Sequence, residues 1–76
     1  MQLPEDYTNF LKLLTIRQLT ILRFVANDFT SKEIAQKLEI GEKTVQKHRE
    51  NILKKANVSG RKEIHAFMWE IRAYLF

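Results

Sequence analysis

Residues 41–55 read GEKTVQKHRENILKK, a helical pattern with five cationic side chains and few apolar ones. An α-helix turns by about 100° per residue, so Val45, Ile52 and Ala56 fall within one narrow stripe. The opposite face presents long polar side chains, which are Lys43, Gln46, Lys47, Glu50 and Lys54. We therefore expect a helix that docks on its neighbours through the stripe and turns its polar face outward.

A shorter helix is predicted immediately before this one. Thr30 and Glu33 have the spacing of a capping box, in which each side chain bonds the backbone N–H of the other residue. Its inward-facing residues are expected to be Ile34, Ala35 and Leu38. Only residues 39–41 connect the two helices, with Ile40 apolar enough to plug the corner and Gly41 free to adopt the angles that the turn or the next N-cap requires. Two helices joined so tightly must cross, which is the geometry of a helix-turn-helix.

Two helices are predicted upstream of this pair. The chain has two glycines, one proline and no β-branched alternation, so the expected fold is all-α. Pro4 suits the first turn of a short amphipathic helix that carries Tyr7, Phe10, Leu11 and Leu14. A capping box of Thr15 and Gln18 opens the next helix, which ends near Asp28. We assign residues 1–13 to an N-terminal amphipathic helix or linker and residues 14–76 to the helix-turn-helix domain.

The last predicted helix starts after Ser59, a suitable N-cap, and continues to about Leu75. Its core stripe consists of Ile64, Phe67, Met68, Ile71 and Leu75. A second apolar side carries His65, Ala66, Trp69, Ala73 and Phe76. A helix that is apolar over so much of its circumference needs a second contact, and an aromatic residue between small ones suits a symmetry-related copy. The alternative is that the N-terminal helix folds back over Trp69.

The positive charge of the chain is local. The formal net charge is +4, yet residues 43–62 contain seven Lys or Arg and a single acid, Glu50. A concentrated basic surface attracts phosphate backbones, although a solvated helix can also be basic without any partner. Charge alone therefore leaves nucleic-acid binding and simple solvation as alternatives.

Several classes of function have no support in the sequence. With no cysteine and two widely separated histidines, we expect no metal site and no cofactor. No apolar run approaches the roughly 20 residues that cross a bilayer, and the N-terminus lacks the features of a signal peptide, so we expect a cytoplasmic, nucleoid-associated protein and no membrane partner. No nucleophile, base and orienting group come together, so we expect no enzyme.

A series of short motifs resembles one family. These are Leu14-Thr15-Ile16-Arg17, Ser31-Lys32-Glu33-Ile34-Ala35, Leu38-Glu39-Ile40, Thr44-Val45-Gln46-Lys47-His48, Asn51-Ile52, Lys55 and Val58-Ser59-Gly60-Arg61. Together, without gaps, they are similar to the LuxR/FixJ/GerE-type DNA-binding domain. The resemblance implies a four-helix helix-turn-helix domain, here with a short extra N-terminal helix. It also implies that the third helix of the domain enters the DNA major groove and that the last helix makes a dimer.

Some positions depart from the usual pattern of that family. Gln18 and Thr20 stand where glutamates are frequent, and Asp28 stands where a glycine commonly ends the helix. Gly41 replaces the usual serine cap, and Ile64 replaces an alanine. Gln46 replaces a lysine, which exchanges a cation for an amide suited to adenine.

The predicted base contacts are Gln46, Lys47 and Glu50. They occupy the outward face in the N-terminal half of the recognition helix, where helix-turn-helix proteins place base-reading side chains. For Glu50 a second interpretation stays open, because its spacing from Lys47 and Lys54 also favours pairing within the helix.

The predicted phosphate contacts are Lys32, Lys43, Thr44, Arg49, Lys54 and Arg61. Lys32 and Thr44 lie near helix starts, where the dipole favours an anion, and the resemblance implies phosphate contact at both. Lys54 and Lys55 can equally belong to a solvated face. His48 lies at the edge of the buried stripe and is expected to pack, with one nitrogen donating to a phosphate.

The expected function is sequence-specific binding of double-stranded DNA and regulation of transcription, by a homodimer on a two-fold-symmetric operator. A further partner could be RNA polymerase or another regulator. The alternative is a protein-interaction module that sequesters another regulator through its apolar C-terminal helix.

Overall fold

The computed structural model describes residues 4–75, with residues 4–6 described by their backbone alone. This part of the chain forms five α-helices and a short 3-10 helix, and no strand. The elements are α1 (Pro4–Lys12), α2 (Ile16–Ala26), α3 (Ser31–Leu38), α4 (Glu42–Ala56), α5 (Arg61–Ile71) and η1 (Arg72–Tyr74). The predicted all-α architecture, with four helices preceded by a short extra one, is confirmed.

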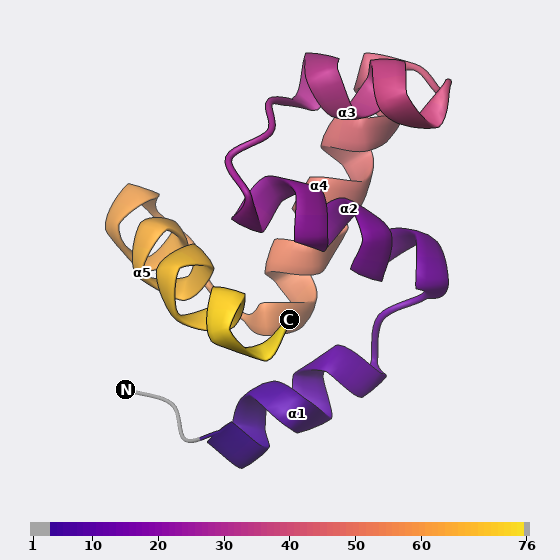
Figure 1. Ribbon diagram of the computed structural model, residues 1–76. Coiled ribbons are helices and arrows are strands. Elements are labelled where there is room, and N and C mark those ends of the chain that lie inside the picture. Colours follow the sequence, from indigo (N-terminus) through magenta and orange to yellow (C-terminus); the bar gives the residue numbers. More distant parts are fainter. Residues whose placement is uncertain (1–3, 76) are drawn as a thin grey trace.

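The long helix α4 organises the arrangement of the others. It packs against both α2 and α3, while α5 packs against α2. Figure 1 shows α3 at the N-terminal end of α4 and α1 at the opposite end of the molecule, next to the chain's C-terminal end. The helix-turn-helix formed by α3 and α4 is therefore well separated from α1.

The core draws on every one of the four domain helices. Its most deeply buried side chains are Ile21, Leu22, Ile34, Val45, Ile52 and Ile71. Val45 and Ile52 are 0% and 1% exposed, which confirms the buried stripe predicted for α4. Branched aliphatic side chains at these positions exclude water and interlock, so they fix how each helix is rotated about its own axis.

Helix α1 completes this core by folding back on α5. Tyr7 and Phe10 are buried, and the Phe10 ring meets the Phe67 ring edge to face at a centroid distance of 5.5 Å. The Tyr7 hydroxyl also donates a hydrogen bond to Glu70 Oε1 at 2.8 Å. The N-terminal helix thus covers the Phe67 side of α5, whereas Trp69 stays 71% exposed. The predicted alternative, in which this helix folds over Trp69, was wrong about the face that it covers.

Both predicted capping boxes are present. The Thr15 hydroxyl accepts from the Gln18 N–H at 3.0 Å, and Gln18 Oε1 accepts from the Thr15 N–H at 3.1 Å. The corresponding distances for Thr30 and Glu33 are 3.1 and 2.8 Å. Each box satisfies two N–H groups that a helix start would otherwise leave unpaired, so it sets where α2 and α3 begin.

The tight turn between α3 and α4 has its left-handed residue two positions before Gly41. Gly41 is the N-cap of α4, as expected, but its φ of −74° is open to any residue. The left-handed residue is Glu39, with φ 57° and ψ 46°. This conformation lets the Ile40 N–H return to the Ala35 carbonyl at 3.1 Å, which caps α3 and turns the chain. Ile40 packs against the core, as predicted.

The boundaries of the last helix were predicted incorrectly. Its N-cap is Gly60, with φ 81° and ψ 148°, and not Ser59. The Ser59 N–H instead donates to Glu63 Oε1 at 3.0 Å. The regular helix ends at Ile71, so Ala73 lies in the 3-10 helix that follows.

Replacing Gly60 with alanine should lower the free energy of unfolding by about 1–3 kcal/mol, because its backbone angles are open almost only to glycine. A Cβ there would meet nothing within 4 Å, so the loss is conformational. The matched control is Gly41→Ser, which should raise stability by about 0.5 kcal/mol, since a serine hydroxyl can cap α4. Urea unfolding followed by circular dichroism measures both, and equal effects at the two glycines would contradict this account.

Candidate nucleic-acid interface

The predicted base-contact residues lie together on the outward face of α4. Gln46, Lys47 and Glu50 are all exposed, while the preceding residue Val45, which belongs to the buried stripe, is fully buried. At about 100° per residue, the three side chains occupy an arc of about 100°. The face therefore carries a cation, a carboxylate and an amide within one and a half turns.

The Glu50 carboxylate is not paired with a neighbour on its own helix. Within residues 4–75, its carboxylate makes no ion pair with Lys47 or Lys54, although both spacings allow one. Its acceptor oxygens thus remain available on the exposed face.

Three of the predicted phosphate-contact residues lie at the starts of α3 and α4. Lys32 is the second residue of α3, and Lys43 and Thr44 are the second and third residues of α4. All three are exposed. The unpaired N–H groups and the positive end of the helix dipole lie in the first turn, so each position adds a side-chain donor or charge where an anion is already favoured.

Arg49, which is predicted to contact a phosphate, also bonds a side chain within the protein. Its Nη1 donates to Ser31 Oγ at 3.0 Å, which joins the middle of α4 to the first residue of α3. A guanidinium has five N–H donors, so this bond leaves others for a phosphate. Because Ser31 precedes Lys32, the bond also brings the start of α3 beside the exposed face of α4. Nothing in the spacing of Ser31 and Arg49 signals this contact.

The remaining cations lie at the other end of α4. Lys54 is exposed near its C-terminus, and Arg61 is the exposed first residue of α5. With a rise of about 1.5 Å per residue, Lys54 lies about 16 Å along the helix from Lys43. The base-contact residues are therefore flanked by cations on both sides along the helix axis.

Lys55 is exposed, as a solvated face requires, but its ammonium group also has hydrogen-bond partners within the chain. Its Nζ donates to the Leu13 carbonyl and to Gln18 Oε1, both at 2.9 Å. The same Gln18 oxygen accepts the Thr15 N–H in the capping box. Lys55 therefore clamps the end of α4 to the junction of α1 and α2. We refer to Leu13, Thr15, Gln18 and Lys55 as the Lys55 clamp.

His48 packs at the edge of the core, as predicted. It is half-buried, and its Nδ1 atom is buried without a hydrogen-bond partner in the described part of the chain. Among residues 4–75, no group of three or more His, Cys, Asp or Glu side chains is arranged to hold a metal ion. No helix in that range is long and apolar enough to cross a membrane.

The predicted dimer residues that the structure describes belong to α5 and η1. His65, Ala66, Trp69 and Ala73 are exposed, and Phe76 lies outside the described residues. The Arg72 guanidinium lies 5.8 Å from the centroid of the Trp69 ring. A large aromatic ring is thus displayed beside two alanines and a cation.

The capping box at the start of α3 affects the titration of the Glu33 carboxyl group. Hydrogen bonds from the Thr30 backbone and hydroxyl, with a smaller contribution from the Lys37 charge, lower the pKa of Glu33 below its ordinary value of 4.5. The folded chain therefore favours the ionised carboxylate.

The sequence matches a known family and several curated proteins. Residues 12–68 match the family described as bacterial regulatory proteins, luxR family. The chain is 43% identical over 51 residues to the spore germination protein GerE of Bacillus subtilis. The aligned region covers 67% of this chain and 69% of GerE. It is 38% identical over 53 residues to the oxygen regulatory protein NreC of Staphylococcus carnosus, covering 70% of this chain and 24% of NreC.

A third relative is the uncharacterized response regulatory protein YgeK of Escherichia coli, with 49% identity over 45 residues. The matched region covers 59% of this chain and 31% of YgeK, so this chain corresponds to only a part of NreC and of YgeK. No solved structure matches the chain. The match over residues 12–68 contains all the motifs on which the resemblance was based.

The stabilising effect of Glu33 should depend on pH. Because its pKa is lowered on folding, its contribution is complete above the ordinary value of 4.5 and is lost as the pH falls through the folded value. The difference in unfolding free energy between the native protein and Glu33→Gln should therefore shrink between about pH 7 and about pH 3. Urea unfolding across that range measures it, and a difference that stays constant would argue against an ionised cap.

Proposed function

Because this chain belongs to the luxR family of bacterial regulatory proteins and forms its DNA-binding helix-turn-helix domain, we propose that it acts as a homodimer on a two-fold-symmetric operator. Each protomer places α4 in a major groove and regulates transcription from that site. Two recognition helices related by a two-fold axis address half-sites about one helical turn of DNA apart.

One observation carries this proposal, which is the exposed face of α4. Val45 is fully buried on the opposite side, so the helix cannot rotate to hide Gln46, Lys47 or Glu50. A lysine can donate to guanine O6 or N7, a glutamine pairs with adenine, and a glutamate accepts from cytosine N4. The three side chains therefore offer a different hydrogen-bonding pattern to each of several base pairs.

The surrounding cations, together with Thr44, are assigned to the DNA backbone. Contacts to phosphates set the register and supply affinity that depends on salt, but they do not discriminate between sequences. The residues in this role are Lys32, Lys43, Thr44, Arg49, Lys54 and Arg61. The bond from Arg49 to Ser31 supports the assignment, because it holds the guanidinium in place before DNA arrives.

The dimer contact is assigned to the free side of α5. Trp69 is 71% exposed, and exposed tryptophans of this kind are typical anchors at protein interfaces. His65, Ala66 and Ala73 lie on the same side, and the small alanines allow two helices to approach closely. We extend the contact to Phe76 from its place in the sequence.

The experiment that tests the function is selection from a randomised pool of duplex DNA, with affinity measured across salt concentrations. Enrichment of a palindromic site supports both sequence-specific binding and the dimer. Weak binding without sequence preference that vanishes with salt would contradict the proposal and leave only an electrostatic surface.

Two lysine substitutions separate base reading from backbone contact. Lys47→Ala should change the preference at particular base pairs by about 1–3 kcal/mol, because it removes a donor to a base edge. Lys32→Ala should weaken binding to all sequences alike and reduce the salt dependence. Competition binding against a panel of single-base operator variants measures both effects. A uniform loss from both substitutions would contradict this division.

Trp69→Ala should shift the protein towards monomer, since it removes the largest exposed ring from the proposed interface. The substitution should leave the fold intact, because the side chain lies outside the core. Light scattering gives the mass, and Ile16→Ala is a control at another exposed apolar residue, which is 87% exposed. An unchanged mass for Trp69→Ala would refute this interface.

A further inference from the structure

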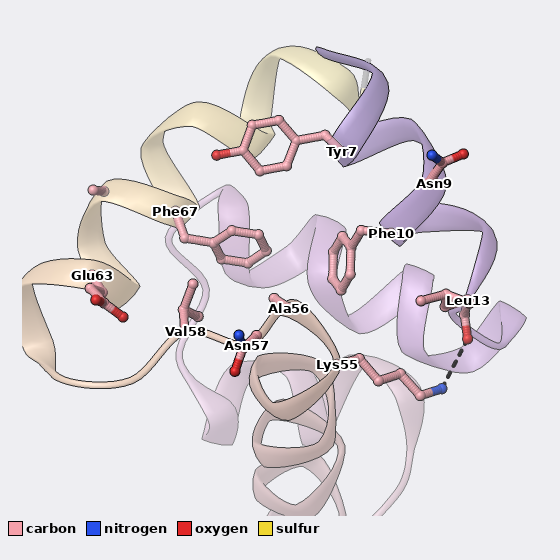
Figure 2. Close-up of a pocket in the computed structure, with 11 residues that line it drawn as sticks. Tyr7, Asn9, Phe10, Leu13, Lys55, Ala56, Asn57, Val58, Glu63 and Phe67 are labelled. Carbon is pink, nitrogen blue, oxygen red and sulfur yellow. Dashed lines mark hydrogen bonds between the residues drawn. The ribbon is translucent and has the colours of Figure 1, made fainter. Parts of the chain in front are cut away.

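A groove opens between α1, the end of α4 and the start of α5. Its volume is about 570 Å³, which lies within the range of sites for small molecules. Figure 2 shows the rings of Tyr7, Phe10 and Phe67 along its wall, with Lys55 and Glu63 near opposite ends. The groove lies at the end of α4 that is far from Gln46 and Lys47, about 13 Å along the helix axis.

The wall of the groove is mainly apolar. Besides the three rings it includes Leu13, Ala56, Val58 and Ala66. Leu13 is 62% exposed, although it is a large aliphatic residue next to a buried core. The three rings are only 3–8% exposed, so the apolar surface that a bound aliphatic body would remove from water is mainly that of Leu13, Ala56, Val58 and Ala66.

One end of the groove offers a positive charge with a free donor. Lys55 Nζ donates to the Leu13 carbonyl, drawn in Figure 2, and to Gln18 Oε1. An ammonium group has three N–H donors, so one remains for a further acceptor.

The acid at the other end is already engaged. Glu63 Oε1 accepts the Ser59 N–H at 3.0 Å, and the residue lies in the first turn of α5, where the helix dipole favours a negative charge. Its carboxylate therefore stabilises the start of α5, while the cationic end beside Leu13 has a donor to offer an anion.

We propose that this groove binds an amphipathic monocarboxylic acid. The carboxylate accepts the third N–H of Lys55, and the apolar body lies along Phe10 and Phe67 toward Val58. Such a ligand bridges α1 to the end of α4 without covering the base-contact residues. Ligand binding to this groove needs neither DNA nor a dimer, although Ala66 belongs both to the groove wall and to the proposed dimer contact.

The probe is decanoate, kept below its micelle concentration, with 1-decanol as the neutral comparison. Titration calorimetry gives the affinity, and amide chemical shifts give the location on the intact chain. We expect decanoate to bind at least about tenfold more tightly than decanol, with shift changes centred on Phe10, Lys55 and Phe67. Equal affinities, shift changes centred on Trp69, or no binding of decanoate would overturn the proposal.

Three variants distinguish the carboxylate contact from general charge effects. Lys55→Gln should weaken decanoate about tenfold, Lys55→Arg should preserve most of the affinity, and Lys12→Gln should leave it unchanged despite the same loss of charge. Equal losses from Lys55→Gln and Lys12→Gln would overturn the specific contact.

A fourth variant keeps the test valid if Lys55→Gln breaks the Lys55 clamp and the protein no longer folds. Asn9 is exposed and lines the groove from α1, so Asn9→Trp should fill the space without disturbing the core. We expect this variant to fold and to lose decanoate binding. Retained affinity in a folded Asn9→Trp protein would place the ligand elsewhere and overturn the proposal.

Discussion

The structure depends on the burial of one narrow stripe of α4. Val45 and Ile52 are almost inaccessible to water, and they hold the helix between α2 and α3. Because their side chains fix the rotation of the helix about its axis, every polar residue of α4 is assigned a direction. Gln46, Lys47 and Glu50 point outward for this reason, and the cations of the same helix are carried to both ends of that face. The interface is thus a consequence of core packing.

Features that rest on local interactions could be predicted from the sequence. The two capping boxes join residues three apart, and the stripe of α4 follows from helical periodicity alone, so both are legible without tertiary information. The turn into α4 was harder to predict. Gly41 was expected to meet the needs of the turn or of the N-cap, and it is the N-cap, but the left-handed angles of the turn are those of Glu39, which the sequence did not indicate. Positive φ also occurs at Gly60 and at two other residues that are not glycine, Asp28 and Asn57. Asp28 stands where the family commonly has glycine, which the angle explains.

The contacts that could not be predicted join residues far apart in the chain. Arg49 bonds Ser31 across the helix-turn-helix, and Lys55 bonds Leu13 and Gln18 across 42 and 37 positions. A basic helix contains several lysines of similar appearance, and only the packing decides which one meets an acceptor. Gln18 shows the same limitation. Its spacing from Thr15 identified a cap, but its role as the acceptor for Lys55 depends on where α4 ends.

Helix α5 shows how a small domain can use two faces of one short element. Phe67 and Trp69 are two residues apart, which places them about 200° apart around the helix. Phe67 is buried by Tyr7 and Phe10, whereas Trp69 is open to solvent. A chain of this size buries only about 60% of its unfolded surface, so the cover that α1 gives to one face adds apolar burial that the four domain helices lack. Because α1 lies on the Phe67 side, it leaves the Trp69 side free. Cover within the chain and contact with a second copy are therefore compatible, and the alternatives that the sequence set against each other need not compete.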